Sequence, residues 1–417
     1  MDRRPGTPRL LRELNDRAAL ELLLTGGPMT RAQLGERTGL SKVTASQLLA
    51  RLEDRGLVEV AGEQAGGRGP NAAIYGVVPS SAYVAGLHVE IDEVRAGVAD
   101  VTGRVVTEIS VDPNGAGNPV ELVRGAVARA CTAAGISPEA LRAFVIGTPG
   151  VLDPRTGDLW LAVNLPAWHE GVHEALSADL GRPVTIENDV NLAAMAERAA
   201  GAAVGVEDFV LVWIGVGLGL ATMLGGRLHR GVGGAAGEIG YLPVPGVPLP
   251  QDITHPATGA FQSLVGAQAV LPLAAGYGFA APTAAAAVRA AVEAEAAVEA
   301  EAGAAGAAGA GGTGAAPGDT GAGRRGAAFL AELAGRVALG VAAVSVVLDP
   351  GLVVLGGEVG LAGGVALASR VAAEVGRISP AKPRVVPTAV SGKPVLRGAI
   401  LAAVDAARAE LLASVAS

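Results

Sequence analysis

The stretch that most constrains the fold covers residues 30–56, where two short helical segments flank a tight turn. Thr30 and Ser41 are residues of the N-cap type, one before each segment. Gly39 can adopt the positive φ that the turn between them requires, and Gly56 ends the second helix. Apolar residues return at helical spacing along the second segment: Val43, Leu48, Leu49 and Leu52. The pattern predicts a helix-turn-helix, whose second helix enters a DNA major groove.

The polar residues of the second helix suit contact with DNA. They lie off the apolar stripe and are Ser41, Lys42, Thr44, Ser46, Gln47 and Arg51. A glutamine such as Gln47 can pair with adenine through two hydrogen bonds, while lysine and hydroxyl side chains bind phosphates or bases. The alternative is a helical hairpin whose polar face is simply solvated.

The residues after the second helix predict a wing. Residues 57–60 alternate like a strand, residues 62–69 form a glycine-rich turn, and residues 73–77 can return as a second strand. Arg68 at the tip of this hairpin is suited to a minor groove. An amphipathic helix is expected before the helix-turn-helix, with a stripe of Leu10, Leu11, Leu14, Ala18, Leu22 and Leu23. We therefore assign residues 1–78 to a winged-helix DNA-binding domain.

The distribution of charge agrees with this assignment. The chain has a net charge of −8, but residues 1–75 carry +2 and the remainder carries −10. A homodimer, or a higher homo-oligomer, would present two such heads to double-stranded DNA and double the phosphate contacts. The chain has one cysteine, Cys131, and no signal-peptide or membrane-spanning pattern. We expect no disulfide within the chain, no membrane association and a cytoplasmic location.

From Tyr83 onward the pattern changes to an α/β fold. Strands are expected at 83–89, 93–99 and 104–108, followed by a helix at 120–134 and a strand at 143–147. This order resembles the start of each half of the two-lobed, actin-like fold of sugar kinases and chaperone ATPases. A second half begins with strands at 209–214, 219–224 and 227–229. Within this domain, residues 82–417, the Ala- and Gly-rich segment 274–326 predicts a disordered surface insertion whose first part can be helical.

Three further stretches carry a family resemblance. They are residues 164–168 (NLPAW), residues 186–191 (IENDVN) and residues 233–241 (GGAAGEIGY). In this order, and together with the winged helix, they resemble the ROK family of repressors and sugar kinases. The resemblance implies that Asn164, Asn188, Asp189 and Glu238 line a sugar pocket. It also implies that Asp189 would be the catalytic base if the protein were a kinase. Taken alone, an Asn-Asp pair after a strand is more typical of a helix cap.

Departures from the kinase pattern argue against phosphoryl transfer. The kinases of this family carry a phosphate hairpin resembling Gly-x-Asp-x-Gly-Gly-Thr, whereas this chain has His88, Glu90, Ile91 and Asp92 at the matching positions after Gly86. Carboxylates there would repel a triphosphate. Val216 also replaces the usual hydroxyl of the second phosphate loop. We therefore expect no nucleotide cofactor and no enzymatic activity.

The zinc site of many family members is also missing from the pattern. Those members have a histidine where this chain has Tyr241, and a cysteine-rich loop that residues 242–250 lack. We predict no bound metal. The lost histidine, and a glutamate beyond the cysteines that has no evident counterpart here, also weaken the sugar assignment.

The sequence thus predicts a transcriptional regulator, with repression as the expected action and a sugar or sugar derivative as effector. Ligand binding would shift the population of arrangements of two heads on a palindromic operator. One alternative is an active sugar kinase with a DNA-binding appendage. Another is a regulator with a vestigial pocket that responds to a protein partner or to no ligand. The sugar, the operator and the target genes are not encoded in any motif.

Overall fold

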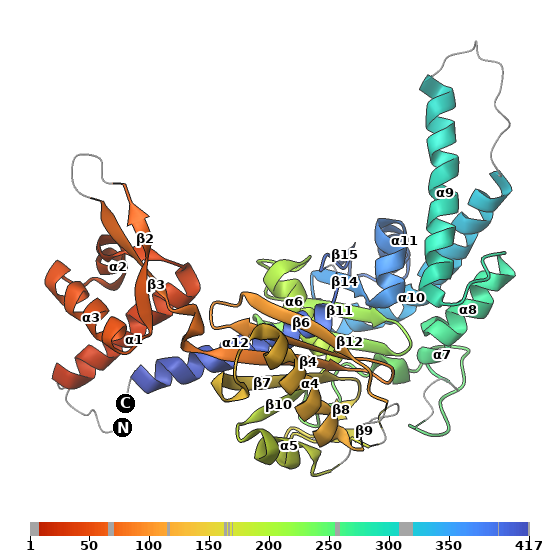
Figure 1. Ribbon diagram of the computed structural model, residues 1–417. Coiled ribbons are helices and arrows are strands. Elements are labelled where there is room, and N and C mark those ends of the chain that lie inside the picture. The colour runs from red at the N-terminus through yellow and green to blue at the C-terminus, as the bar shows by residue number, and fades with distance from the viewer. Residues whose placement is uncertain are drawn as a thin grey trace. The chain divides into compact units, whose positions relative to one another are not determined.

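The computed structural model describes residues 8–65, 71–114, 117–161, 165, 167–168, 170–254, 259–307, 320–390 and 392–415 (Figure 1). The chain divides into two compact units. Unit 1 comprises Met1–Gly147, Gly171–Ile186 and Ala399–Ser417, and unit 2 comprises Thr148–Glu170 and Glu187–Gly398. The predicted domain boundary at residues 78–82 stays a prediction.

The N-terminal part of unit 1 is a winged helix, as the sequence predicted. Its elements are α1 (Pro8–Gly26), β1 (Met29–Thr30), α2 (Arg31–Thr38), α3 (Lys42–Asp54), β2 (Val58–Gln64) and β3 (Ala72–Val77). The three strands pair in the order β1-β3-β2. Thr30 and Gln33 form a capping box at α2, and Gly39 ends that helix with φ 71°. Ser41 caps α3 by accepting a hydrogen bond from the Thr44 amide. Local sequence signals therefore set the boundaries of both helices.

The apolar stripe expected on α1 was partly wrong. Leu10, Leu11 and Leu14 are exposed, whereas Leu20, with Ala19, Leu23 and Leu24, is buried. Helical spacing identifies residues that share a face, but the face that meets α3 and β3 is chosen by tertiary packing.

The remainder of unit 1 is an α/β lobe around one five-stranded sheet, in the order β10-β7-β4-β5-β6. Its elements are η1 (Pro79–Ser81), β4 (Tyr83–Val89), β5 (Val94–Asp100), β6 (Val105–Val111), α4 (Pro119–Ala134), η2 (Pro138–Ala140), β7 (Leu141–Thr148), α5 (Val172–Leu180), β10 (Val184–Asn188) and α12 (Pro394–Val415). Strand β4 is antiparallel to β5 and parallel to β7. A side chain at Gly86 or Gly97 would collide with Ile400, so glycine lets α12 pack closely on β4 and β5.

Unit 2 contains a second five-stranded sheet, in the order β13-β12-β11-β14-β15, and a two-stranded β8-β9 ribbon. The strands are β8 (Val151–Leu152), β9 (Leu159–Leu161), β11 (Phe209–Ile214), β12 (Leu218–Leu224), β13 (Arg227–Leu228), β14 (Leu352–Gly356) and β15 (Arg384–Pro387). The helices are α6 (Asp189–Ala200), η3 (Ile239–Tyr241), α7 (Gln262–Val265), α8 (Ala267–Gly276), α9 (Ala284–Ala307), α10 (Thr320–Leu348) and α11 (Gly357–Ile378). The predicted strand-rich start of the second half is present.

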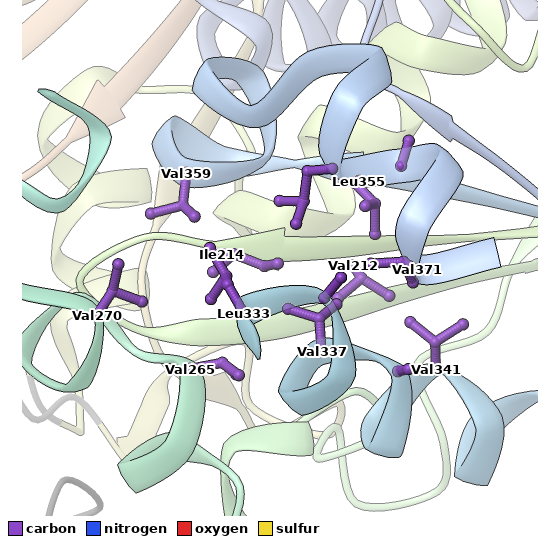
Figure 2. Close-up of a cluster of buried hydrophobic side chains, with 14 of the residues drawn as sticks. Val212, Ile214, Val265, Val270, Leu333, Val337, Val341, Leu355, Val359 and Val371 are labelled. Atoms are coloured by element: carbon purple, nitrogen blue, oxygen red, sulfur yellow. The ribbon is translucent and has the colours of Figure 1, made fainter. Parts of the chain in front are cut away.

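The main core of unit 2 lies between this sheet and its covering helices. Figure 2 shows Val212 and Ile214 of β11 facing Leu333 and Val337 of α10, with Val371 of α11 nearby. Helices α10 and α11 are long and apolar enough to cross a membrane by length and composition. Because their buried side chains belong to this core, packing against the sheet accounts for that composition.

The segment 274–326 was predicted as a surface insertion that can be helical in its first part and is disordered in the rest; the first part is helical, but it is partly buried. Residues 284–307 form α9, and α10 begins at Thr320. Ala287 and Val288 are fully buried in the core of unit 2. Glycine at position 326 lets α10 pack against the backbone of α9, and Arg370 of α11 forms an ion pair with Glu295 of α9. Small side chains permit this close helix packing, which supplies the burial that composition alone seemed to lack. Residues 308–319 lie outside the described residues.

Candidate DNA-binding surface and effector site

The outer face of α3 carries the residues predicted to contact DNA. Lys42 and Gln47 are exposed on it. The hydroxyls already have partners within the head: Ser41 Oγ and Thr44 Oγ1 lie 2.9 Å apart, and Ser46 Oγ donates to the Lys42 carbonyl. A bound phosphate or base would therefore have to share or replace these hydrogen bonds.

The structure adds one residue to this face. Val43 was assigned to the apolar stripe, yet it is 67% exposed, one helical turn before Gln47. An apolar side chain beside an amide is suited to the methyl group of thymine. The i, i+4 spacing of Val43 and Gln47 was the available signal, but the hydrophobic character of valine pointed to the core instead.

Arg51 has a different environment from the one predicted. Its guanidinium forms an ion pair with Asp16 of α1, with Nε 2.9 Å from Oδ2. The side-chain hydrogen bond to Asp16 raises the pKa of Arg51. This arginine therefore joins two helices of the head, and its planar donor edge is already occupied. Arg68 lies outside the described residues.

Asn188 and Asp189 lie at the junction of β10 and α6, both partly buried. Asn188 is the N-cap of α6: its Oδ1 accepts from the Asn191 amide, and its Nδ2 donates to the Gly150 carbonyl at 3.1 Å. The helix-cap alternative therefore describes the geometry of Asn188. One amide proton and one lone pair of this side chain remain for a ligand. Asn164 lies outside the described residues.

The neighbouring Glu187, which sequence reasoning passed over, organises this junction. It is buried and accepts hydrogen bonds from the Asn191 side chain and from the Asn188 backbone amide, both at 2.9 Å. Its other oxygen binds Arg230, with Nε at 2.7 Å and Nη2 at 2.6 Å. Glu187 and Arg230 are 43 residues apart. They fasten the Asn188–Asp189 segment to the start of the glycine-rich loop that ends at Glu238.

Glycines fix the course of that loop. A side chain at Gly234 would collide with the Leu152 carbonyl, and one at Gly237 with the Leu220 carbonyl. Both glycines have positive φ, at 76° and 104°. The loop therefore packs on β8, next to the Gly150 carbonyl that binds Asn188. Within unit 2, the Gly150–Leu152 segment thus contacts both Asn188 and the glycine-rich loop that leads to Glu238.

Glu238 and Tyr241 form the acidic end of the loop. Burial raises the pKa of Glu238. Burial also raises the pKa of the Tyr241 hydroxyl, with further contributions from Glu238 and Asp252. Tyr241 occupies the position that matches the zinc-binding histidine of other family members. Its hydroxyl donates to the Ile253 carbonyl and thereby connects the loop to the segment around Ile253. Among the described residues, no group of three or more His, Cys, Asp and Glu side chains could hold a metal ion.

The hairpin that matches the first phosphate loop, in unit 1, is acidic. His88 is buried, and its Nδ1 lies 3.7 Å from Glu90 Oε2. Arg95 contacts Glu90 at 3.4 Å and Glu93 at 2.5 Å. Burial, with a smaller contribution from Arg95, lowers the pKa of His88 to about 4, so this histidine is neutral at pH 7. The turn lacks the glycines that would let a phosphate approach its backbone.

The fold and the site define a protein with a winged-helix head and a body of the sugar-kinase type. The chain belongs to the ROK family, whose model matches residues 84–405. A MarR family model matches residues 13–69, in the winged-helix head.

Individual relatives include regulators and kinases. A xylose repressor of Caldicellulosiruptor bescii is 25% identical over 57% of this chain and 61% of its own length. The chain thus spans about three fifths of the curated relatives it matches. A solved ROK family transcriptional regulator, described as a homologue of the E. coli MLC protein, is 16% identical over 98% of this chain and 99% of its own, with TM-score 0.69. A ROK hexokinase from Thermus thermophilus is 28% identical over 76% of this chain and 97% of its own, with TM-score 0.57.

Proposed function

We propose that this chain is a DNA-binding transcriptional repressor whose ROK domain binds a sugar or sugar derivative and does not transfer phosphoryl groups. The observation that carries the proposal is the exposed face of α3, where Lys42, Val43 and Gln47 lie together on a winged helix. Phosphoryl transfer to a sugar does not require such a DNA-binding face. The repressors among the relatives support the regulatory assignment.

The head acts on DNA through two kinds of contact. Gln47 and Val43 read base edges in the major groove, and Lys42 binds a phosphate. Arg68, which the sequence places in the turn of the predicted wing, is proposed to enter a minor groove. Two heads of a homodimer bind the half-sites of a palindromic operator, which is the geometry that helix-turn-helix proteins use.

The effector binds in unit 2, at the Asn188–Asp189 segment and the glycine-rich loop, both of which contact the Gly150–Leu152 segment. Asn188, Asp189 and Glu238 contribute hydrogen bonds to sugar hydroxyls, together with Asn164. Glu187 and Arg230 hold the Asn188–Asp189 segment in place. A sugar that binds one arrangement of the dimer better than another shifts the population of operator-bound protein.

The DNA-binding half of the proposal is tested with an operator selected from random DNA by the full chain. Fluorescence anisotropy then measures the affinity of Gln47→Ala and Lys42→Ala. Gln47→Ala should lose about 1–3 kcal/mol of discrimination at one base position, and Lys42→Ala should weaken all sequences and reduce the salt slope by about 1. Gln268→Ala and Lys382→Ala, two exposed positions of unit 2, are the matched controls. Equal affinities for all four variants would refute the DNA-binding assignment.

A sugar kinase is the second candidate, favoured by the match to the Thermus thermophilus hexokinase. Asp189 would then remove a proton from the attacking sugar hydroxyl. The candidate requires ATP turnover with a hexose that disappears in Asp189→Asn. Absence of turnover across a panel of hexoses removes it. A thermal-shift screen of sugars and sugar phosphates separates a sensing pocket from a vestigial one, because a ligand raises the melting temperature by mass action.

A further inference from the structure

Gln262, at the start of α7, has a buried side chain with two backbone partners in another segment. Its Oε1 accepts from the Leu218 amide at 2.9 Å, and its Nε2 donates to the Val216 carbonyl at 3.0 Å. Both partners belong to the turn between β11 and β12, at the position of the second phosphate loop. The side chain thus bridges the donor and the acceptor of one turn, across 44 and 46 residues of sequence.

The amide side chain satisfies both partners at once because it carries an acceptor and a donor. A glutamate would still accept from Leu218, but its ionised carboxylate has no proton to donate to the Val216 carbonyl. Because Gln262 is 8% exposed, water does not readily replace a lost partner there.

Two glycines border the Gln262 side chain. A side chain at Gly266 would collide with its Nε2, although the backbone at Gly266, with φ −64° and ψ 158°, suits any residue. A side chain at Gly240 would lie 3.2 Å from its Oε1. Gly240 belongs to η3, which directly follows Glu238. Gln262 therefore lies between the β11–β12 turn and the acidic end of the glycine-rich loop.

We propose that Gln262 is a positioning residue that holds the β11–β12 turn and the Glu238–Tyr241 segment in one fixed arrangement. The turn then supports the glycine-rich loop, while the Leu218 amide and the Val216 carbonyl of the turn are both hydrogen-bonded to Gln262. This role concerns unit 2 by itself, and its test requires no ligand. Failure of the test would leave the proposed function standing.

The test is amide hydrogen exchange, followed by mass spectrometry on the full chain. Gln262→Glu removes the hydrogen bond to the Val216 carbonyl. Gly266→Ala keeps residue 262 as glutamine but pushes its side-chain amide away from the turn. In both variants, peptides that cover 215–218 and 238–241 should exchange about tenfold faster than in the wild type, as expected for one lost buried hydrogen bond. A peptide from α4 should be unchanged. Gly276→Ala is the matched control, because a side chain there meets no atom within 4 Å.

Trp213 provides an independent signal. Its Nε1 lies 3.1 Å from the position that a side chain at Gly215 would take, so the indole reports on the turn. With Trp160 and Trp168 replaced by phenylalanine, the fluorescence of Trp213 should shift in Gln262→Glu and Gly266→Ala and stay unchanged in Gly276→Ala. If both segments of the Gln262→Glu and Gly266→Ala variants exchange at the rate of the wild type, the proposal is overturned. Faster exchange confined to the turn would overturn it too, because the two segments would then move separately.

Discussion

Arg51 of α3 and Asp16 of α1 are joined by an ion pair, with the arginine Nε 2.9 Å from Oδ2 of a largely buried carboxylate. An arginine on the second helix of a helix-turn-helix would ordinarily be assigned to DNA. Here it connects that helix to the first helix of the head, and it thereby orients the face that carries Lys42 and Gln47.

Arg51→Ala should therefore act first on stability. Removing the guanidinium leaves the Asp16 carboxylate without its charged partner, at a cost of about 1–2 kcal/mol, since the arginine itself is partly exposed. Urea unfolding measures the loss, and replacing Asp16 by Asn in the same chain should recover part of it. If Arg51→Ala instead leaves stability unchanged and abolishes operator binding, the arginine contacts DNA.

Val43 should contribute to DNA recognition and not to folding. Because the side chain is exposed, Val43→Ser should leave the melting temperature within about 1 °C of the wild type. Operator affinity should fall by about 1 kcal/mol through the loss of an apolar contact with a thymine methyl. Anisotropy with operators that carry uracil in place of thymine identifies the base. A large drop in melting temperature would place Val43 in the core.

The ion pair between Glu187 and Arg230 should support the effector site. Arg230→Gln leaves a buried carboxylate short of its charged partner, and we expect a loss of about 2 kcal/mol of stability, together with a weaker thermal shift on adding the effector. Arg227→Gln, an exposed arginine of β13, is the matched control. Arg230→Gln that binds the effector as the wild type does would show that the pair has no part in the site.

His88 should make stability depend on pH. Its folded pKa of about 4 lies below the ordinary value of 6.5, so the unfolded chain binds the proton more readily. The contribution of His88 is fully present above pH 6.5 and is lost as the pH falls toward 4. The total change is about 3 kcal/mol. Chemical unfolding of wild type and His88→Gln between pH 4 and 7 measures it. The stability of the wild type relative to His88→Gln should rise by that amount between pH 4 and 7, whereas an exposed histidine would leave this difference unchanged with pH.

Local signals in the sequence predicted the head well, because they act over three or four residues. The Thr30 capping box, the Gly39 turn and the Ser41 cap each depend only on neighbours. The charged partners of Arg51 and Glu187 and the backbone partners of Gln262 are 35 or more residues away, so no motif contains them. The burial of α9 likewise depends on α10 and α11, whose glycine and ion-pair contacts cannot be inferred from an alanine-rich composition.

The residues predicted for the sugar pocket divide in the same way. The cap geometry of Asn188 follows from an Asn-Asp pair after a strand, and the alternative considered from the sequence described it. That Asn188 and the glycine-rich loop contact the same short segment depends on the Gly150 and Leu152 backbone carbonyls, which no side-chain pattern in the sequence reveals. The role of Asn164 in the sugar pocket stays a prediction.

The central claim is that a body of the sugar-kinase type controls a DNA-binding head without transferring phosphate. The most direct measurement is the anisotropy of the selected operator with the full chain, titrated with a panel of pentoses, hexoses and their phosphates, with and without ATP and Mg²⁺. The account predicts that one sugar class releases the operator, that ATP makes no difference and that no ADP forms. Sugar-dependent ADP formation that is lost in Asp189→Asn, with operator binding indifferent to every sugar, would contradict it.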